Sequence, residues 1–272
     1  MAKINMNYLI YIVLGLAPSI IWLLFYLRKD THPESNKMVL KIFFIGMLVT
    51  IPTALAEIGI FYTLAGGKDI MDDVWRQNFP FLSLIYGFLG IALIEEFLKY
   101  LIVRQKVLND PEFDEPVDVM LYMIIAALGF AALENIFYLL PSGENPEILL
   151  TTVFTSLFRF LGATFLHSLC SGIFGYFLAL SFLNIKKSFR FVVLGLTTAT
   201  VLHGLFNLSI MKIGDSLAKD PQTGNPVIAN PQLFVFSLLF LIILLSGLAF
   251  FVSLGFKKIK KLASVCKVHP VK

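Results

Sequence analysis

The stretch FPFLSLIYGFLGIALIEEFLKY, residues 79–100, decides the fold and raises the question of function. Residues 79–94 carry no charged side chain, and they run directly into Glu95, Glu96 and Lys99. A helix needs about 20 mainly apolar residues to cross the roughly 30 Å hydrocarbon core of a bilayer. The stretch therefore predicts a membrane-spanning helix with two adjacent carboxylates and a lysine at membrane depth.

The whole chain has the composition of a polytopic membrane protein. Of its 272 residues, 57% are hydrophobic and 15% are charged, and the mean hydropathy is +0.81. These values exclude an ordinary soluble domain. We expect an all-α transmembrane bundle of about seven spans, folded as a single domain over residues 1–272 with its motif core at about 79–211. The apolar stretches that predict the spans are residues 6–27, 38–65, 79–103, 118–140, 150–183, 190–211 and 232–256.

The distribution of Lys and Arg predicts the orientation in the membrane. Fifteen of the 22 basic residues lie in one alternating set of connections, which includes the C-terminal tail, and five lie in the other set. Because Lys and Arg accumulate in cytoplasmic loops, we expect the N-terminus outside and the C-terminus in the cytoplasm of a multi-pass cell-membrane protein. The two remaining cations, Lys99 and Arg159, fall within spans.

The C-terminal tail and the cysteines exclude two other classes. Six basic residues occupy the last 16 positions, directly after an apolar stretch. That placement indicates contact with the anionic lipid bilayer and not with nucleic acid. Cys170 and Cys266 form no CxxC or other pairing motif, so neither redox chemistry nor a disulfide framework is indicated.

Function must then reside in polar side chains inside the spans. A charged residue at the centre of a membrane helix costs roughly 2.5 to 3.5 kcal/mol on insertion scales, so such residues usually pair within the bundle and mark a site. A purely structural bundle would have little reason to carry many of them. The candidates are Glu57, Glu95, Glu96, Lys99, Glu134, Arg159, His167, His203 and Asn207.

Spacing shows how these groups can converge and also allows purely structural roles. Glu95 and Lys99 are four residues apart and can pair on one helix face, either as a structural pair or as part of a catalytic site. Glu57 and Arg159 are interpreted as counter-ions of each other. For Asn135, a hydrogen bond to another helix is the preferred interpretation. A common depth for Glu95 and Glu134 requires the third helix to run on through Val107, and we expect that extension.

Four short motifs follow one another along the chain: Glu95-Glu96-x-x-Lys99, Phe130-x-x-x-Glu134-Asn135, His167 after an upstream Arg, and His203-Gly204-x-x-Asn207. This ordered set resembles the PrsW family of intramembrane proteases, a relative of the CAAX prenyl proteases and of bacteriocin-processing proteins. The resemblance covers residues 90–210, and the outer helices carry no recognised signature. Two positions depart from the CAAX pattern, since Glu134 stands where those proteases have a histidine and Ser171 stands where an Asn would follow His167.

The resemblance implies an integral-membrane endopeptidase that cuts single-span or membrane-anchored protein substrates. The role best known for the family is the first cut in an anti-sigma factor, which releases a stress response. Carried over to this chain, Glu95 and Glu96 would supply the general base, and His167 and His203 would be catalytic or metal-ligating. Two other classes remain open from the residues alone: a proton-coupled secondary transporter, and a non-catalytic membrane scaffold.

Peptide hydrolysis needs an activated water, stabilisation of charge on the carbonyl oxygen and a proton for the leaving amine. In one scheme Glu95 or Glu96 activates water, and His203 and Asn207 donate hydrogen bonds to the oxyanion. In the other, Glu134, His167 and His203 bind a divalent metal such as zinc, which leaves Glu95 as the base. We slightly favour the metal scheme, with Glu95 as the base, Glu96 close behind, and Lys99, Glu134 and Arg159 in support.

Overall fold

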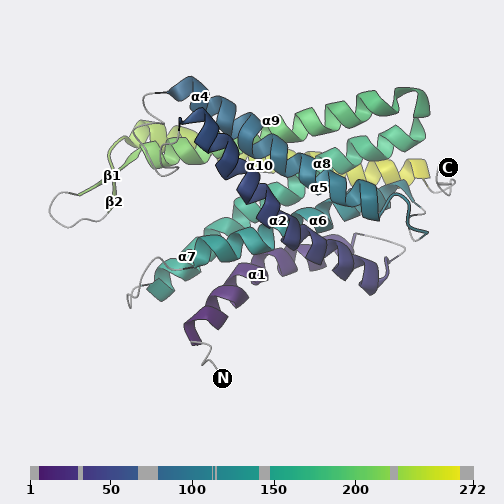
Figure 1. The fold of residues 1–272 in the computed structure, drawn as a ribbon, viewed down its shortest axis with the longest axis horizontal. Coiled ribbons are helices and arrows are strands. Elements are labelled where there is room, and N and C mark those ends of the chain that lie inside the picture. The colour runs from purple at the N-terminus through teal and green to yellow at the C-terminus, as the bar shows by residue number, and fades with distance from the viewer. Residues whose placement is uncertain are drawn as a thin grey trace.

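The computed structural model describes residues 6–29, 33–66, 79–111, 113, 115–140, 148–220 and 226–263, and Figure 1 shows the fold. A hairpin of two short antiparallel strands, β1 (Leu217–Lys219) and β2 (Pro226–Ile228), connects the last two long helices. The helices are α1 (Met6–Leu27), α2 (Asn36–Leu64), α4 (Pro80–Ile85), the π-helix η1 (Tyr86–Ala92), α5 (Leu93–Lys106), α6 (Pro116–Leu139), α7 (Ile148–Leu161), α8 (Ala163–Leu183), the 3₁₀ helix η2 (Ile185–Lys187), α9 (Ser188–Asp215) and α10 (Pro231–Ala263).

The prediction of an all-α bundle with about seven spans is confirmed. Seven described helical stretches are long and apolar enough to cross a bilayer. The third stretch, Pro80–Lys106, joins α4, η1 and α5, with Val107 as its C-cap. The expected extension of this helix is therefore present, and the small hairpin at 217–228 is a feature that the sequence did not lead us to expect.

Helix α6 lies at the centre of the bundle and packs against α1, α2 and α8. Every residue from Pro116 to Ala132 is buried. Small side chains let α6 approach its neighbours closely: a Cβ at Gly129 would overlap the carbonyl oxygen of Phe43 in α2, and one at Gly46 would overlap the carbonyl oxygen of Ala126. This packing fixes the depth of α6, and with it the position of Glu134.

The fifth span is broken where α7 meets α8. Gly162 separates the two helices with φ −101° and ψ −95°, and a Cβ there would lie 2.8 Å from the carbonyl oxygen of Phe158. The indole of Trp22 in α1 donates a hydrogen bond to the carbonyl oxygen of Phe160 at 3.0 Å. The break lies between Arg159 and His167 and so controls how these two side chains are presented to the centre of the bundle.

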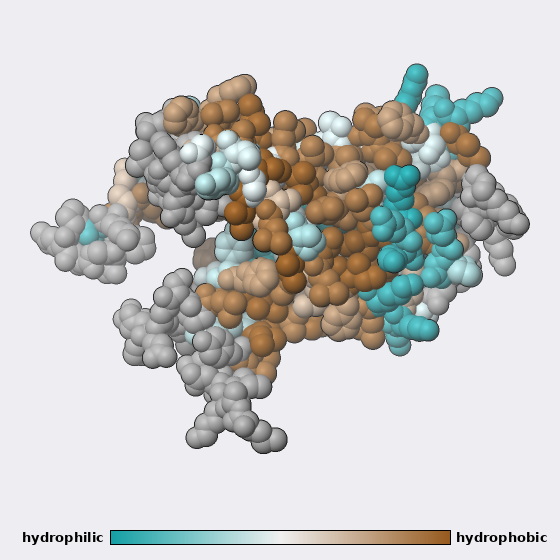
Figure 2. Space-filling model, in the orientation of Figure 1, coloured by the Kyte–Doolittle hydropathy of each residue, from teal (hydrophilic) through white to brown (hydrophobic). Residues whose placement is uncertain are grey.

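The surface has an apolar belt and one basic end. Figure 2 shows hydrophobic residues over the middle of the molecule and hydrophilic residues gathered at one end. The C-terminal ends of α1, α5, α8 and α10 all lie at that end, and the C-terminal end of α6 and the strands β1 and β2 lie at the other (Figure 1). The predictions of orientation and of cysteine chemistry also rest on residues that lie outside the described ones, namely Lys3, Lys68, Arg76, Cys266, Lys267 and Lys272.

We predict that this basic end faces the cytoplasm. Peptide tags at the N-terminus and in the loop at 212–231 should be labelled by an impermeant reagent in intact cells, because these segments carry few Lys and Arg residues. A tag after Lys272 should be labelled only after permeabilisation. External labelling of the C-terminal tag would show that the orientation is inverted.

Candidate active site

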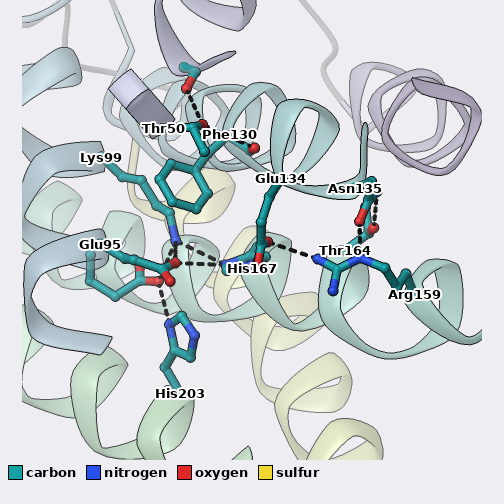
Figure 3. Close-up of polar contacts among 12 residues, drawn as sticks. Thr50, Glu95, Lys99, Phe130, Glu134, Asn135, Arg159, Thr164, His167 and His203 are labelled. Atoms are coloured by element: carbon teal, nitrogen blue, oxygen red, sulfur yellow. Dashed lines mark hydrogen bonds and ion pairs between the residues drawn. The ribbon is translucent and has the colours of Figure 1, made fainter. Parts of the chain in front are cut away.

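The N-terminal turns of α5 place three charged side chains, Glu95, Glu96 and Lys99, in the bundle interior. Figure 3 shows Glu95 and Lys99 there. Lys99 Nζ lies 3.0 Å from Glu95 Oε2 and 2.9 Å from Glu96 Oε1. Lys99 and Glu96 are completely buried, and Glu95 is 5% exposed. The predicted i,i+4 pair of Glu95 and Lys99 is therefore present, and Glu96 shares the same ammonium group.

A π-helix directly precedes these residues and sets their direction. Each π-turn inserts one residue into the α-helical repeat and rotates the rest of the helix, and such turns are frequent at functional sites. The ring of Phe88 in η1 lies against Gly204 of α9, where any Cβ would overlap it. Gly204 thus lets η1 and α9 pack closely, and the adjacent His203 meets α5, with its Nδ1 3.0 Å from Glu96 Oε1.

His167 of α8 bridges the α5 cluster and a second carboxylate. Its Nδ1 lies 2.9 Å from Lys99 Nζ, and its Nε2 lies 2.9 Å from Glu134 Oε2. Because an ammonium group can only donate, Nδ1 accepts from Lys99, and a neutral ring then donates from Nε2 to Glu134. His167 is thereby held between two groups with a defined tautomer.

The outer side of the site is formed by Glu134, Arg159 and Asn135 (Figure 3). Arg159 Nη2 lies 3.0 Å from Glu134 Oε2, and Arg159 Nε donates to Asn135 Oδ1 at 2.5 Å. The interpretation of Glu57 as the counter-ion of Arg159 is wrong, because Arg159 pairs with Glu134. Asn135 Nδ2 donates to Thr164 Oγ1 at 2.9 Å, which confirms its structural hydrogen bond to another helix.

Lys99 Nζ occupies the centre of the whole arrangement. It contacts Glu95, Glu96 and His167, and it lies 4.3 Å from the centroid of the Phe130 ring. Phe130 is therefore more than packing, because its face provides a cation–π contact. One potential metal-ligand atom from each of Glu95, Glu96, His167 and His203 lies within 4.8 Å of the others. The centre of this group of four is a position suited to a cation.

Three further polar residues, Glu134, Asn207 and Ser171, lie outside the group of four potential metal ligands. Glu134 is outside the group of four and reaches it through His167 Nε2. Asn207 is half-buried one turn beyond His203, and its side chain makes no hydrogen bond to any described residue. Ser171, which in the sequence stands out only as a departure from the CAAX pattern, donates to Glu96 Oε2 at 3.1 Å. Its position four residues after His167, on the same helix face, was the signal for that role.

Comparison with known proteins relates this geometry to a family. The family described as "PrsW family intramembrane metalloprotease" matches residues 34–245, which include every side chain of the cluster. The chain belongs to this family. PrsW proteins are therefore its relatives in sequence, and the protein is an intramembrane peptidase of the metallo type. The match covers the second to sixth spans completely and part of the seventh.

Individual PrsW relatives support the assignment over most of their length. "Protease PrsW" of Geobacillus kaustophilus is 31% identical over 194 residues, which are 71% of this chain and 76% of that protein. The proteins of the same name from Oceanobacillus iheyensis and Bacillus subtilis are 29% and 28% identical and cover 71% and 74% of this chain and 79% and 83% of their own lengths. No solved structure matches the chain significantly.

The PrsW assignment decides between the classes that the residues had left open. It supports the protease and neither the proton-coupled transporter nor the scaffold. With seven spanning helices and bacterial relatives, the chain is a multi-pass protein of the cell membrane. Its substrates are membrane-tethered proteins that are cut within the bilayer.

Proposed function

We propose that the buried cluster of Glu95, Glu96, His167 and His203 is the catalytic centre that hydrolyses the peptide bond. The observation that carries this proposal is the convergence of two carboxylates and two imidazoles from α5, α8 and α9 within 4.8 Å. Burying such groups in a membrane costs free energy, so their presence usually marks a functional site. Nothing in the packing of α6 against its neighbours requires them.

The residues of the cluster fit a divalent metal such as zinc. Imidazole and carboxylate are both accepted zinc ligands, and the site contains three carboxylates, of Glu95, Glu96 and Glu134, against the two cations Lys99 and Arg159. We propose Glu96, His167 and His203 as the ligands. When bound, the metal would polarise the peptide carbonyl and acidify a water molecule.

This ligand set differs from the Glu134, His167 and His203 set that the sequence suggested. Glu134 contacts the ring nitrogen of His167 that faces away from Lys99. A carboxylate in that position typically fixes the ring orientation and tautomer of a ligating histidine. We therefore propose Glu134, held by Arg159, as the group that orients His167, and Glu96 in its place as a ligand.

We propose Glu95 as the general base. Glu96 is held on both oxygens, by Lys99 and His203 at Oε1 and by Ser171 at Oε2. The described residues hold Glu95 at Oε2, through Lys99, and leave Oε1 without a hydrogen bond. Glu95 is thus free to take a proton from a water molecule while the water oxygen adds to the carbonyl carbon. It can then give that proton to the leaving nitrogen as the C–N bond breaks.

We propose that the substrate approaches from the end opposite the basic one. Exposure increases in that direction, from 0% at Lys99 to 13% and 21% for the side chains of Arg159 and Glu134. Figure 2 shows the molecule hollowed at this end, between the lobe with α1 and α7 and the lobe with α4, α9 and α10. Asn207 lies one turn beyond His203 and makes no hydrogen bond to a described side chain, and we propose that it donates to the substrate carbonyl.

We propose a single-span protein as substrate, of the anti-sigma-factor type that the resemblance implies. The direct test uses purified protein in detergent with a single-span substrate. We expect cleavage that is lost after chelation and restored by zinc, with about one metal ion per chain by mass spectrometry. His167→Ala and His203→Ala should remain folded, lose cleavage and bind less metal. Full cleavage by the protein after the metal has been removed with chelator would refute the proposed metal site. It would favour the scheme in which Glu95 or Glu96 activates water without a metal.

A further inference from the structure

A cavity lies on the other side of α8 from the buried cluster of Glu95, Glu96, His167 and His203. It has a volume of about 500 Å³ and is bordered by α1, the α7–α8 junction and α10. This volume lies within the roughly 300 to 1,000 Å³ of typical ligand pockets. Its walls are almost entirely aliphatic and aromatic, and Ile21 and Phe25 on its edge are exposed on the bilayer side of α1. The cavity is thus a groove that is open to lipid.

Three lysines line this groove at its basic end. Lys29 follows α1, and Lys257 and Lys260 belong to the last turns of α10. Lys260 Nζ donates to the carbonyl oxygen of Lys29, and the ammonium group of Lys29 lies 4.8 Å from the centroid of the Phe25 ring. No carboxylate occurs among the described residues that line the groove. An apolar slot with three cations at one end complements an anionic amphiphile.

One wall of the groove is formed by the segment of α8 that carries His167, on the helix face opposite His167. Phe165 and Leu169 line the groove two residues before and after His167. The Trp22 ring stacks on Phe165 at a centroid distance of 4.3 Å and on Phe160 at 5.4 Å. An occupant of the groove would therefore contact both helices at the α7–α8 break.

We propose that this groove binds one anionic phospholipid of the cytoplasmic leaflet. An acyl chain fills the apolar slot between α1 and α10, and the phosphate headgroup contacts Lys29, Lys257 and Lys260. Basic residues at the membrane surface attract anionic lipid, and the groove adds a shaped site for the chain. The bound lipid supports the turn of α8 that presents His167 to the cluster. Binding of the lipid itself does not depend on the roles proposed for the catalytic residues, none of which lines the groove.

Trp22 lines the groove and can report its occupancy. The chain has two tryptophans, so Trp75→Phe leaves Trp22 as the only one. In vesicles of unlabelled phosphatidylcholine, we expect brominated phosphatidylglycerol to quench Trp22 with at least tenfold higher relative affinity than brominated phosphatidylcholine. Replacing Lys29, Lys257 and Lys260 together by Gln should bring this preference close to one, since each lysine contributes about fivefold. Replacing all three by Arg should retain it.

The matched control removes three lysines from the same basic end but outside the groove. Lys186, Lys187 and Lys261 are exposed and do not line it, so their replacement by Gln should leave the preference unchanged. Soluble glycerol phosphate should not displace the brominated lipid, because it lacks an acyl chain. Equal quenching by both lipids, an unchanged preference in the Lys29/Lys257/Lys260 Gln variant, or displacement by glycerol phosphate would each overturn the proposal.

Discussion

Glu95→Gln should abolish cleavage while the protein inserts, accumulates and unfolds like the parent. Gln keeps the shape of Glu and can still accept a hydrogen bond from Lys99, which lies 3.0 Å from Glu95 Oε2, but it cannot take a proton from water. Loss of a general base typically lowers the rate by about a hundredfold to ten-thousandfold. The measurement is the initial rate of cleavage of a single-span substrate, with abundance and the thermal unfolding midpoint measured in parallel.

Glu96→Gln is the matched variant, since it makes the same change at the neighbouring position. It should also reduce cleavage, but with a clear fall in the unfolding midpoint, because Glu96 is held by Lys99, Ser171 and His203 together. Comparing the cleavage rate with the unfolding midpoint in the two variants therefore distinguishes a loss of catalysis from a loss of stability. Cleavage at the parental rate in both would refute this cluster as the catalytic centre.

The fold and the convergence of Glu95, Glu96, His167 and His203 in the candidate site followed from the sequence, because both depend on local patterns. Apolar length predicted the spans, and the spacing of Glu95 and Lys99 predicted their pairing. The pairing of Arg159 with Glu134 instead of Glu57 did not follow, because it depends on the break at Gly162 and on the relative depth of two helices. The π-helix before Glu95 was signalled only by Gly87 and Gly90, and glycines have many other roles in membrane helices.

The central position of Lys99 also lay beyond the sequence, since it depends on the rotation of α5 relative to α8. In the structure, Lys99 Nζ contacts three of the four proposed members of the centre. Its ammonium group provides the positive charge that the two carboxylates need inside a bundle. A divalent metal held by the same side chains would provide positive charge at nearly the same place. The two cations therefore make overlapping contributions to the stability of the cluster.

Lys99→Met should expose this overlap. Met is similar in length but has no charge, so two buried carboxylates lose their cation. Breaking a buried ion pair typically costs about 3 to 5 kcal/mol, and we expect a loss of that size in the free energy of unfolding of chelator-treated protein in detergent. Zinc should raise the unfolding midpoint of the Lys99→Met variant more than that of the parent, because the metal then supplies the missing charge.

Lys212→Met is the matched control. Lys212 Nζ lies 2.9 Å from Asp215 Oδ2, but the pair is at the surface, with side chains 47% and 29% exposed. Such a pair contributes only about 0 to 1 kcal/mol. Its unfolding should be nearly parental and no more sensitive to zinc than the parent. If Lys99→Met is as stable as the parent in chelator, Lys99 is not the cation that holds the cluster together. If it is destabilised but zinc gives no added protection, Glu96, His167 and His203 are not the ligands of the metal.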